Sequence, residues 1–151
     1  MFRSRVSVSL ALTLFALAGC AGSPNRTPGS GTSASFDEMT PTQIAAWSAT
    51  SKYPQSSPVK KMDVTVIVNQ DKNTIKVYNL SGAPLRNSKL WVNKTFVAKV
   101  DAVAPQTNLV INTERLYDSV GNVFSKQKLE VTTVQLETDG ALFDLLGPVA
   151  E

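Results

Sequence analysis

Cys20 is the residue whose type and position most directly suggest covalent chemistry in this chain. It is the only cysteine, and it ends the stretch Leu17-Ala18-Gly19-Cys20. A thiolate can attack as a nucleophile or carry a covalent group, and nucleophilic catalysis normally needs a neighbouring base. The chain contains no histidine, so the commonest general base and the commonest metal ligand are both missing. Acid–base chemistry would therefore fall to carboxylates, serines and lysines.

The aspartates match turn positions better than an active site. Asp71, Asp118 and Asp139 stand where turns are expected, and aspartate suits turns because its side chain bonds the local backbone. Asp139 and Asp144 could converge as the acid pair of a hydrolase, but the sequence does not set their separation. A calcium loop of the D-x-D-x-D type is not present. We predict no metal site.

A serine–lysine pair is the remaining catalytic candidate. Ser57 and Lys60 have the spacing of such a pair, but Pro58 opposes the helix that would place both side chains on one face. The chain also has no P-loop and no glycine-rich dinucleotide fingerprint. We predict no catalytic residue, and expect that the protein is not an enzyme.

The N-terminal segment has the layout of a secretory signal. Arg3 and Arg5 precede an apolar run from Val6 to Leu17, whose length of about 12 residues is too short to cross the ~30 Å hydrocarbon core as a helix. Two cleavage sites are compatible with it. Cleavage after Ala16-Leu17-Ala18 would leave Cys20 as a free thiol, whereas cleavage directly before Cys20 would make it the first mature residue.

The four residues that end at Cys20 favour the second site. Leu17-Ala18-Gly19-Cys20 resembles the lipobox of bacterial lipoproteins at every position. The resemblance implies a diacylglyceryl group on the Cys20 sulfur, often with an amide-linked acyl chain, and no other cofactor. It also implies a protein held in the cell envelope by its lipid. Ala21 replaces the aspartate that commonly retains such proteins at the inner membrane, so the outer membrane, facing the periplasm, is expected if the host has one.

The charge balance argues against a nucleic-acid partner. The full chain carries a formal charge of +3, but removing Arg3 and Arg5 from its 15 basic residues leaves 13 against 12 acidic residues, a balance of +1. Lys60-Lys61 is the only adjacent basic pair in the mature part. The dense basic face that binds phosphates is therefore not expected.

Composition divides the chain into four parts. Residues 1–19 are the signal, and residues 20–35 are the lipidated cysteine and a Gly/Ser/Pro/Thr linker that we expect to be a disordered tether. Residues 36–61 hold a short helix and an extended connector. Thr40 can cap this helix, Pro41 suits its first position, and we expect it to end near Ser51 and to dock on the main domain. Residues 62–151 form that domain.

The main domain has the pattern of short β-strands. Val64, Val66 and Val68 alternate with polar residues, as a half-buried strand requires. Seven or eight such strands are separated by turns, the strongest being Asp139-Gly140, and they include a short strand at Val123-Phe124 and a long one from Leu129 to Glu137. This mainly β pattern resembles an immunoglobulin-like or fibronectin-III-like antiparallel β-sandwich. Leu116-Tyr117-Asp118 followed by Gly121 also resembles part of FxLYD-type bacterial domains.

Trp91 is the aromatic residue with the clearest functional alternative. A two-residue loop at Asn93-Lys94 would pair Trp91 with Phe96 on the core face. A three-residue loop would turn Trp91 outward and leave the core to alternating residues: Leu90, Val92, Phe96, Ala98 and Val100. We expect the second arrangement, because its apolar alternation is better. An outward Trp91, with Trp47 and Tyr53, could contact a partner or a glycan. Alternatively, the N-terminal helix or a neighbouring loop covers it.

Two functional hypotheses follow. The first is an envelope lipoprotein whose non-catalytic β domain binds or supports another envelope component, most simply a protein, with residues 107–113 as a candidate edge for strand addition. The second is a glycan- or peptidoglycan-binding module that uses exposed aromatic residues. Fold class does not decide between them, since sandwiches host many functions.

Overall fold

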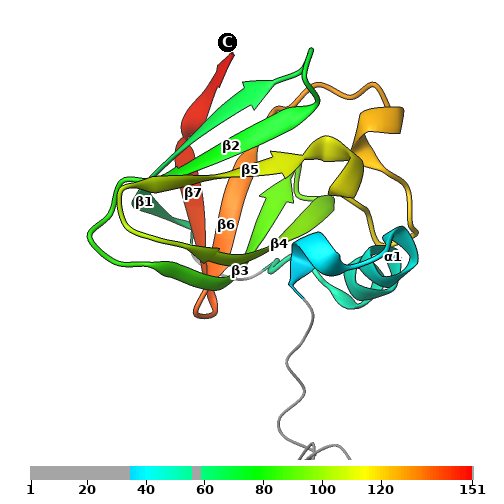
Figure 1. The fold of residues 1–151 in the computed structure, drawn as a ribbon, viewed down its shortest axis with the longest axis horizontal. Helices are drawn as coiled ribbons and strands as arrows, with labels where there is room; N and C mark the ends of the chain where they lie inside the picture. The colour runs from blue at the N-terminus through cyan, green and yellow to red at the C-terminus, as the bar shows by residue number, and fades with distance from the viewer. Residues whose placement is uncertain (1–34, 56–58, 151) are drawn as a thin grey trace, which may run out of the picture. The chain divides into compact units, whose positions relative to one another are not determined.

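The computed structural model describes residues 35–55 and 59–150, with the backbone alone at 59 and 146–150. The chain is mainly β, with one α-helix and three short 3-10 helices in this part (Figure 1). The helical elements are η1 (Phe36–Glu38), α1 (Pro41–Thr50), η2 (Thr113–Arg115) and η3 (Phe124–Lys126). The strands are β1 (Val59–Asn69), β2 (Thr74–Asn79), β3 (Leu85–Val92), β4 (Phe96–Val103), β5 (Thr107–Asn112), β6 (Val134–Thr138) and β7 (Ala141–Ala150).

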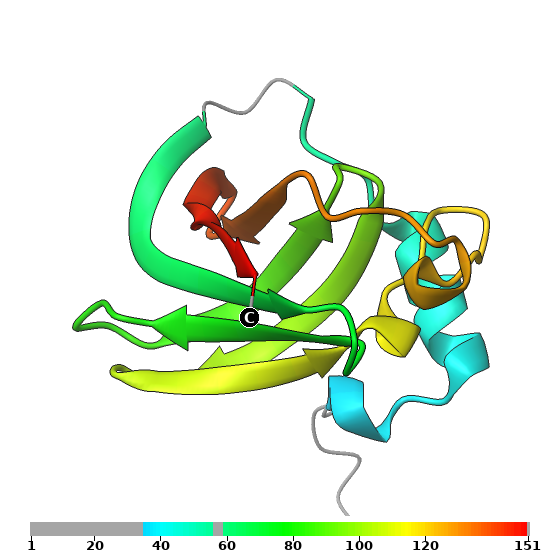
Figure 2. The same cartoon turned by 90° about the horizontal axis from the view of Figure 1, so that it is seen from above.

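The described strands form one curled sheet in the order β4-β3-β6-β7-β1-β2-β5 (Figure 2). The sandwich of two antiparallel sheets is not confirmed, because β1 pairs in parallel with β7 and joins both halves into one nearly closed, barrel-like sheet. The β1–β7 register shifts twice, between Lys61 and Thr65 and between Thr65 and Ile67. Such irregularities bend a strand, and bending lets a single sheet enclose its own core.

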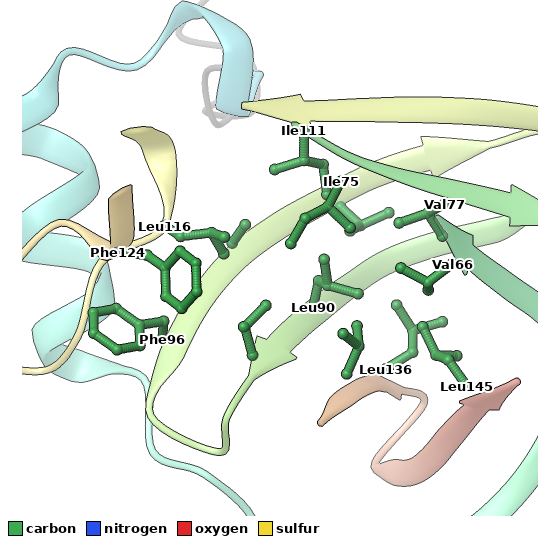
Figure 3. Close-up of a cluster of buried hydrophobic side chains, with 14 of the residues drawn as sticks. Val66, Ile75, Val77, Leu90, Phe96, Ile111, Leu116, Phe124, Leu136 and Leu145 are labelled. Carbon is green, nitrogen blue, oxygen red and sulfur yellow. The ribbon is translucent and has the colours of Figure 1, made fainter. Parts of the chain in front are cut away.

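The core lies inside this curl and is built by strand alternation. Along β2, buried residues alternate with half-buried ones, and the predicted alternation of Val64, Val66 and Val68 in β1 is confirmed. Figure 3 shows side chains from all seven described strands converging with two from outside the sheet: Val66, Ile75, Val77, Leu90, Phe96, Ile111, Leu116, Phe124, Leu136 and Leu145. Each large apolar side chain that is fully buried stabilises the fold by roughly 1.5–3 kcal/mol.

The predicted helix is present and capped as expected. The side chain of Thr40 accepts a hydrogen bond from the N–H of Gln43, and the side chain of Gln43 accepts one from the N–H of Thr40. Ile44 is 1% exposed and packs into the core, so docking on the sheet supplies the stability that a three-turn helix lacks alone. No helix in the described residues is long and apolar enough to cross a membrane.

The predicted long strand from Leu129 to Glu137 is wrong in its first half. Regular pairing starts at Val134, and the preceding residues bond the side chain of Asn93 instead. The Asn93 Oδ1 atom accepts from the N–H groups of Thr132 (2.8 Å) and Thr133 (3.2 Å). The predicted strand at Val123-Phe124 is reduced to one isolated bridge between Val123 and Tyr117, since Phe124 begins η3. Local hydrogen bonding and packing override β propensity at both places.

Candidate functional site

The two edge strands of the sheet, β4 and β5, are joined by residues 104–106 and diverge from there. They are consecutive in the chain but do not pair, which leaves a gap in the otherwise continuous sheet. We call this gap the seam. Within the seam, η1 lies beside both strands (Figures 1 and 2), and at the far end Val97 of β4 pairs with Tyr117 instead of with β5.

The free edge of β5 carries backbone groups that point away from the sheet. Thr113 donates its N–H to the carbonyl oxygen of Asn73 at 2.8 Å. In the register of β5 with β2, this bond shows that the odd-numbered residues of β5 are the ones whose backbone groups bond β2. Because hydrogen-bonded positions alternate along an antiparallel pair, Asn108, Val110 and Asn112 direct their N–H and C=O groups toward the seam side. These three positions can accept another strand.

The side chains of β5 leave this edge unprotected. The strand has no charged residue and no proline, and its register with β2 runs without a bulge. Val110 is 51% exposed, whereas Ile111 on the opposite face is buried. Natural sheet edges are usually blocked by lysine, proline or a bulge, because a bare edge pairs with other chains. The edge of β5 therefore has the form of a binding surface.

A pocket of about 270 Å³ lies in the seam next to this edge. Phe36 of η1, Ala102 of β4, and Leu109 and Ile111 of β5 supply its apolar lining. Four charged residues also line it: Asp37, Lys99, Asp101 and Arg115. An apolar side chain of an added strand fits the apolar part of this lining, because Lys99, Asp101 and Arg115 already bind one another or η1, and Asp37 is an exposed residue of η1 itself.

Asp101 holds η1 in the seam. Its Oδ2 atom accepts hydrogen bonds from the N–H of Phe36 (2.6 Å) and the hydroxyl of Ser35 (3.2 Å), and its Oδ1 atom pairs with Lys99 Nζ at 2.7 Å. Burial alone would raise the pKa of Asp101, but these hydrogen bonds and the charge of Lys99 outweigh it and lower the pKa. The ionised carboxylate thus fixes the start of η1.

Arg115 holds the same element from the other side. Its Nη2 atom donates to the carbonyl oxygens of Phe36 and, at 3.3 Å, Met39, and its guanidinium carbon lies 5.1 Å from the centroid of the Phe36 ring. Phe36 itself is 5% exposed. Two charged residues from distant parts of the chain therefore keep this ring in the seam.

The sequence did not predict this group of Phe36, Asp101 and Arg115. Phe36 is an apolar residue directly after a long polar linker, which is a weak signal that it docks somewhere. Its partners lie 65 and 79 residues further along the chain, and no local pattern connects them. The strand edge, in contrast, was predicted correctly, since β5 is an edge strand of the described sheet.

The hairpin loop at Asn93 confirms the predicted outward direction of Trp91, and of the two alternatives for an outward Trp91 the structure has the covered one. Val92 pairs with Phe96 and Trp91 with Val97, as a three-residue loop requires. Trp91 then packs outside the main core against Val97 and Leu142, and only 2% of it is exposed. The predicted contact of Trp91 with a glycan or partner is therefore not available in this conformation, because its rings are covered.

Tyr53 and Trp47 form that cover. The Tyr53 ring meets Trp91 edge-on at 5.5 Å, and its hydroxyl donates to Gln135 Oε1 at 2.6 Å. Trp47 is half-buried and meets Phe36 edge-on at 5.9 Å. The Trp91 indole N–H donates to Glu137 Oε2 at 2.9 Å. The three predicted aromatic residues thus do lie together, and they attach α1 and the following segment to the sheet.

The predicted aspartates have structural roles, as hydrogen-bond acceptors or turn residues. Asp118 accepts hydrogen bonds from the backbone N–H groups of Val120 and Asn122, and Asp139 lies in the β6–β7 turn with a φ of 49°. Asp144 accepts from Gln135 Nε2 at 2.7 Å, further along that hairpin. The described residues hold no group of three His, Cys, Asp or Glu side chains that could bind a metal ion. Cys20 and Ser57 lie outside the described residues.

Comparison of the chain with protein-family models, with curated proteins and with solved structures finds no match. The class of protein is therefore defined by the described residues themselves. They form a small, barrel-like β domain with one unprotected sheet edge and an apolar pocket beside it.

Replacing Asp101 with asparagine is expected to loosen η1. The variant loses the charge-assisted hydrogen bond to the Phe36 N–H and the ion pair with Lys99, so exchange of the Phe36 amide hydrogen should become about tenfold faster. Hydrogen exchange followed by NMR measures this rate. Asp37→Asn, an exposed change within η1, is the matched control and should leave it unaltered.

Acid should remove from the native protein the stabilisation that the ionised Asp101 carboxylate provides. A pKa lowered by folding means that Asp101 stabilises the fold fully above its unfolded value of about 3.9 and loses this effect as pH falls through the folded pKa. The difference in unfolding free energy between the native protein and Asp101→Asn should therefore narrow below about pH 4. A difference that stays constant on acidification contradicts this role.

Proposed function

We propose that this chain is a non-catalytic envelope lipoprotein, anchored through Cys20, whose β domain binds an extended segment of another envelope protein along β5. The observation that carries the binding part is the free edge of β5, with three outward backbone positions in an uncharged strand. Strand addition supplies affinity through backbone hydrogen bonds and specificity through alternate side chains. The edge and the seam pocket together offer both.

The chemistry of the seam defines the segment that fits it. An added strand would pair with Asn108, Val110 and Asn112, which needs about five residues without proline at the bonded positions. Side chains on its inner face would meet Phe36 and Leu109, so an apolar residue is favoured there. One on its outer face would lie beside Val110, again favouring an apolar or β-branched residue.

The N-terminal sequence supports the envelope setting of this proposal. The lipobox-like stretch ending at Cys20 supplies a membrane anchor, and Ala21 after it favours the outer membrane. A linker of the composition of residues 20–35 has an r.m.s. reach of roughly 20 Å when flexible, which suffices to place a domain clear of lipid headgroups. An anchored domain with a free strand edge suits a partner in the same compartment.

Val110→Pro is the sharpest test of strand addition. The Val110 N–H points to the free edge, so proline removes a donor that the fold does not use, and edge strands tolerate proline. A photo-crosslinking residue at position 108 in the full chain should capture one protein in cells, and Val110→Pro should reduce that product at least tenfold. Val110→Thr keeps the N–H and should retain the product.

Three outcomes overturn the proposal. Capture that is equally strong in the Val110→Pro protein means that the edge does not pair as a strand. A product that contains two copies of this chain assigns the edge to self-association. As a control, the photo-crosslinking residue is placed in the buried face of the sheet, where it should give an internal crosslink. If this control works but position 108 gives no product, the edge is unoccupied in cells.

A further inference from the structure

A second pocket lies between the end of α1 and the turn that joins β3 to β4, and it shares no lining residue with the seam pocket. Its volume is about 460 Å³, within the range of small-molecule sites. Lys52, which follows α1, and Lys94, in the β3–β4 turn, both line it, and its other seven lining residues are neutral. We call it the lysine pocket.

The two lysines at this pocket carry charges that the protein does not neutralise. Neither side chain has an ion pair or a hydrogen bond within the described part of the chain. Asp118, which directly precedes the lining residue Ser119, is 8% exposed, and its carboxylate accepts hydrogen bonds within its own turn. Two like charges beside one pocket repel each other, and a bound anion removes this repulsion. The charge of the lining therefore favours an anionic ligand.

The backbone of Lys94 indicates that this lysine is not there to form the turn. Asn93 and Lys94 are the central residues of a turn that the Thr95 N–H closes on the Val92 carbonyl oxygen at 3.1 Å, and their φ angles are 51° and 59°. Such a turn favours asparagine followed by glycine, because a left-handed backbone crowds a Cβ atom. Asn93 suits the first position, whereas Lys94 costs stability at the second. Backbone strain of this kind is concentrated at functional sites.

Lys52 is equally unnecessary for ending α1. A lysine just beyond a helix often bonds the last free carbonyl groups. Here the carbonyl oxygen of Trp47 accepts from the hydroxyls of Thr50 (2.8 Å) and Ser51 (3.1 Å), and that of Ser48 accepts from the Ser51 N–H (3.0 Å). The end of the helix is satisfied by its own residues, so the ammonium group of Lys52 is available to a ligand.

A phosphate monoester matches the lining of the lysine pocket. Its charge at pH 7 is about −1.5 to −2, which balances two lysines, and lysine binds phosphate as a point charge. Ser119 adds a hydroxyl that is exposed and has no hydrogen-bond partner among the described residues. The half-buried ring of Tyr53 also lines the pocket and offers an apolar surface to the carbon part of the ester.

We infer that the lysine pocket binds a phosphate monoester, with Lys52 and Lys94 paired to the phosphate and the Ser119 hydroxyl donating to it. This goes beyond the proposed strand-binding function and depends on neither the anchor nor the β5 edge. A soluble phosphate ester and the headgroup of phosphatidic acid share this chemistry, and the choice of ligands in the experiment separates the two sources.

Titration of the full chain with sn-glycerol 3-phosphate, followed by NMR, tests this assignment. Amide signals of Lys52, Lys94 and Ser119 are expected to shift. Lys94→Gly should weaken binding about tenfold and raise the melting temperature by a few degrees, because glycine relieves the left-handed backbone. Lys52→Gln should weaken binding about as much without this rise, and it keeps the test valid should Lys94→Gly disturb the turn.

Lys128→Gly is the matched control for Lys94→Gly. Lys128 is also an exposed lysine with a positive φ, of 50°, but it does not line the lysine pocket. The control should raise the melting temperature in the same way and leave the affinity for glycerol 3-phosphate unchanged. Loss of binding in both glycine variants contradicts a specific role of Lys94, since it means that any lysine of the domain contributes equally.

Dihexanoyl phosphatidic acid, used below its micelle concentration, identifies the source of the phosphate. Tighter binding than glycerol 3-phosphate assigns the pocket to a lipid headgroup, and equal or weaker binding assigns it to a soluble ester. Unchanged spectra with both ligands exclude the site, as does equal affinity of the native, Lys52→Gln and Lys94→Gly proteins. Shifts of the same size with glycerol or with acetate show that the phosphate is not recognised, and they also overturn the inference.

Discussion

Replacing Cys20 with serine is expected to move the protein from the membrane fraction to the soluble fraction. Serine keeps the size of the side chain but removes the sulfur that would carry the diacylglyceryl group. Two or three acyl chains at about 0.8 kcal/mol per buried methylene hold a protein stably at a bilayer, whereas one chain holds it marginally. Nearly all of the membrane-bound protein should therefore be lost, as fractionation followed by immunoblotting measures directly.

A matched control and a chemical readout make this experiment decisive for the anchor. Ser23→Ala lies three residues beyond the cysteine and should leave fractionation unchanged. Metabolic labelling with an alkyne fatty acid should mark the native protein and Ser23→Ala but not Cys20→Ser. Persistence of the Cys20→Ser protein in the membrane fraction refutes the lipid anchor. A native protein that takes up no label favours the first cleavage site, with Cys20 as a free thiol.

Replacing Trp91 with alanine is expected to destabilise the fold by about 3–5 kcal/mol. Trp91 is 2% exposed, packs against Val97 and Leu142, and is covered edge-on by Tyr53. Its removal leaves a large cavity and also leaves the Glu137 carboxylate without the indole N–H. Chemical denaturation gives the free energy of unfolding directly, and a small domain has few kcal/mol to lose.

Trp91→Phe separates packing from the hydrogen bond. Phenylalanine keeps most of the apolar contact with Tyr53 but cannot donate to Glu137, which retains its bond to Lys89 Nζ at 3.2 Å. The expected loss is about 1 kcal/mol. If the unfolding free energy of Trp91→Ala instead lies within 1 kcal/mol of the native value, the covered arrangement of Trp91 is wrong. A surface role in binding then becomes the better explanation.

These two variants address the two ways in which the sequence suggested function. Cys20 belongs to a contiguous four-residue motif, whose chemistry depends on neighbours in the chain and so can be recognised without a fold. The exposure of Trp91, in contrast, depends on the length of the hairpin loop and on the side chains that cover it. The loop length followed from apolar alternation around Asn93, but the cover is Tyr53, which lies 38 residues away in the sequence.

The same distinction applies to the candidate site at the β5 edge. The edge character of β5 was visible in the sequence as a short strand with neither charge nor proline. The seam beside it needs η1, which Asp101 and Arg115 fix through contacts across more than sixty residues.

Local sequence patterns were enough to predict the capped helix, the period-two strands and the turn at Asp139-Gly140. Each depends on residues within a few positions of one another, so propensity and alternation suffice. The parallel pairing of β1 with β7, the curl of the sheet and the cover over Trp91 depend instead on contacts between distant segments. Those outcomes depend on which apolar faces bury one another across the chain, and alternation shows that a face is buried but not what buries it.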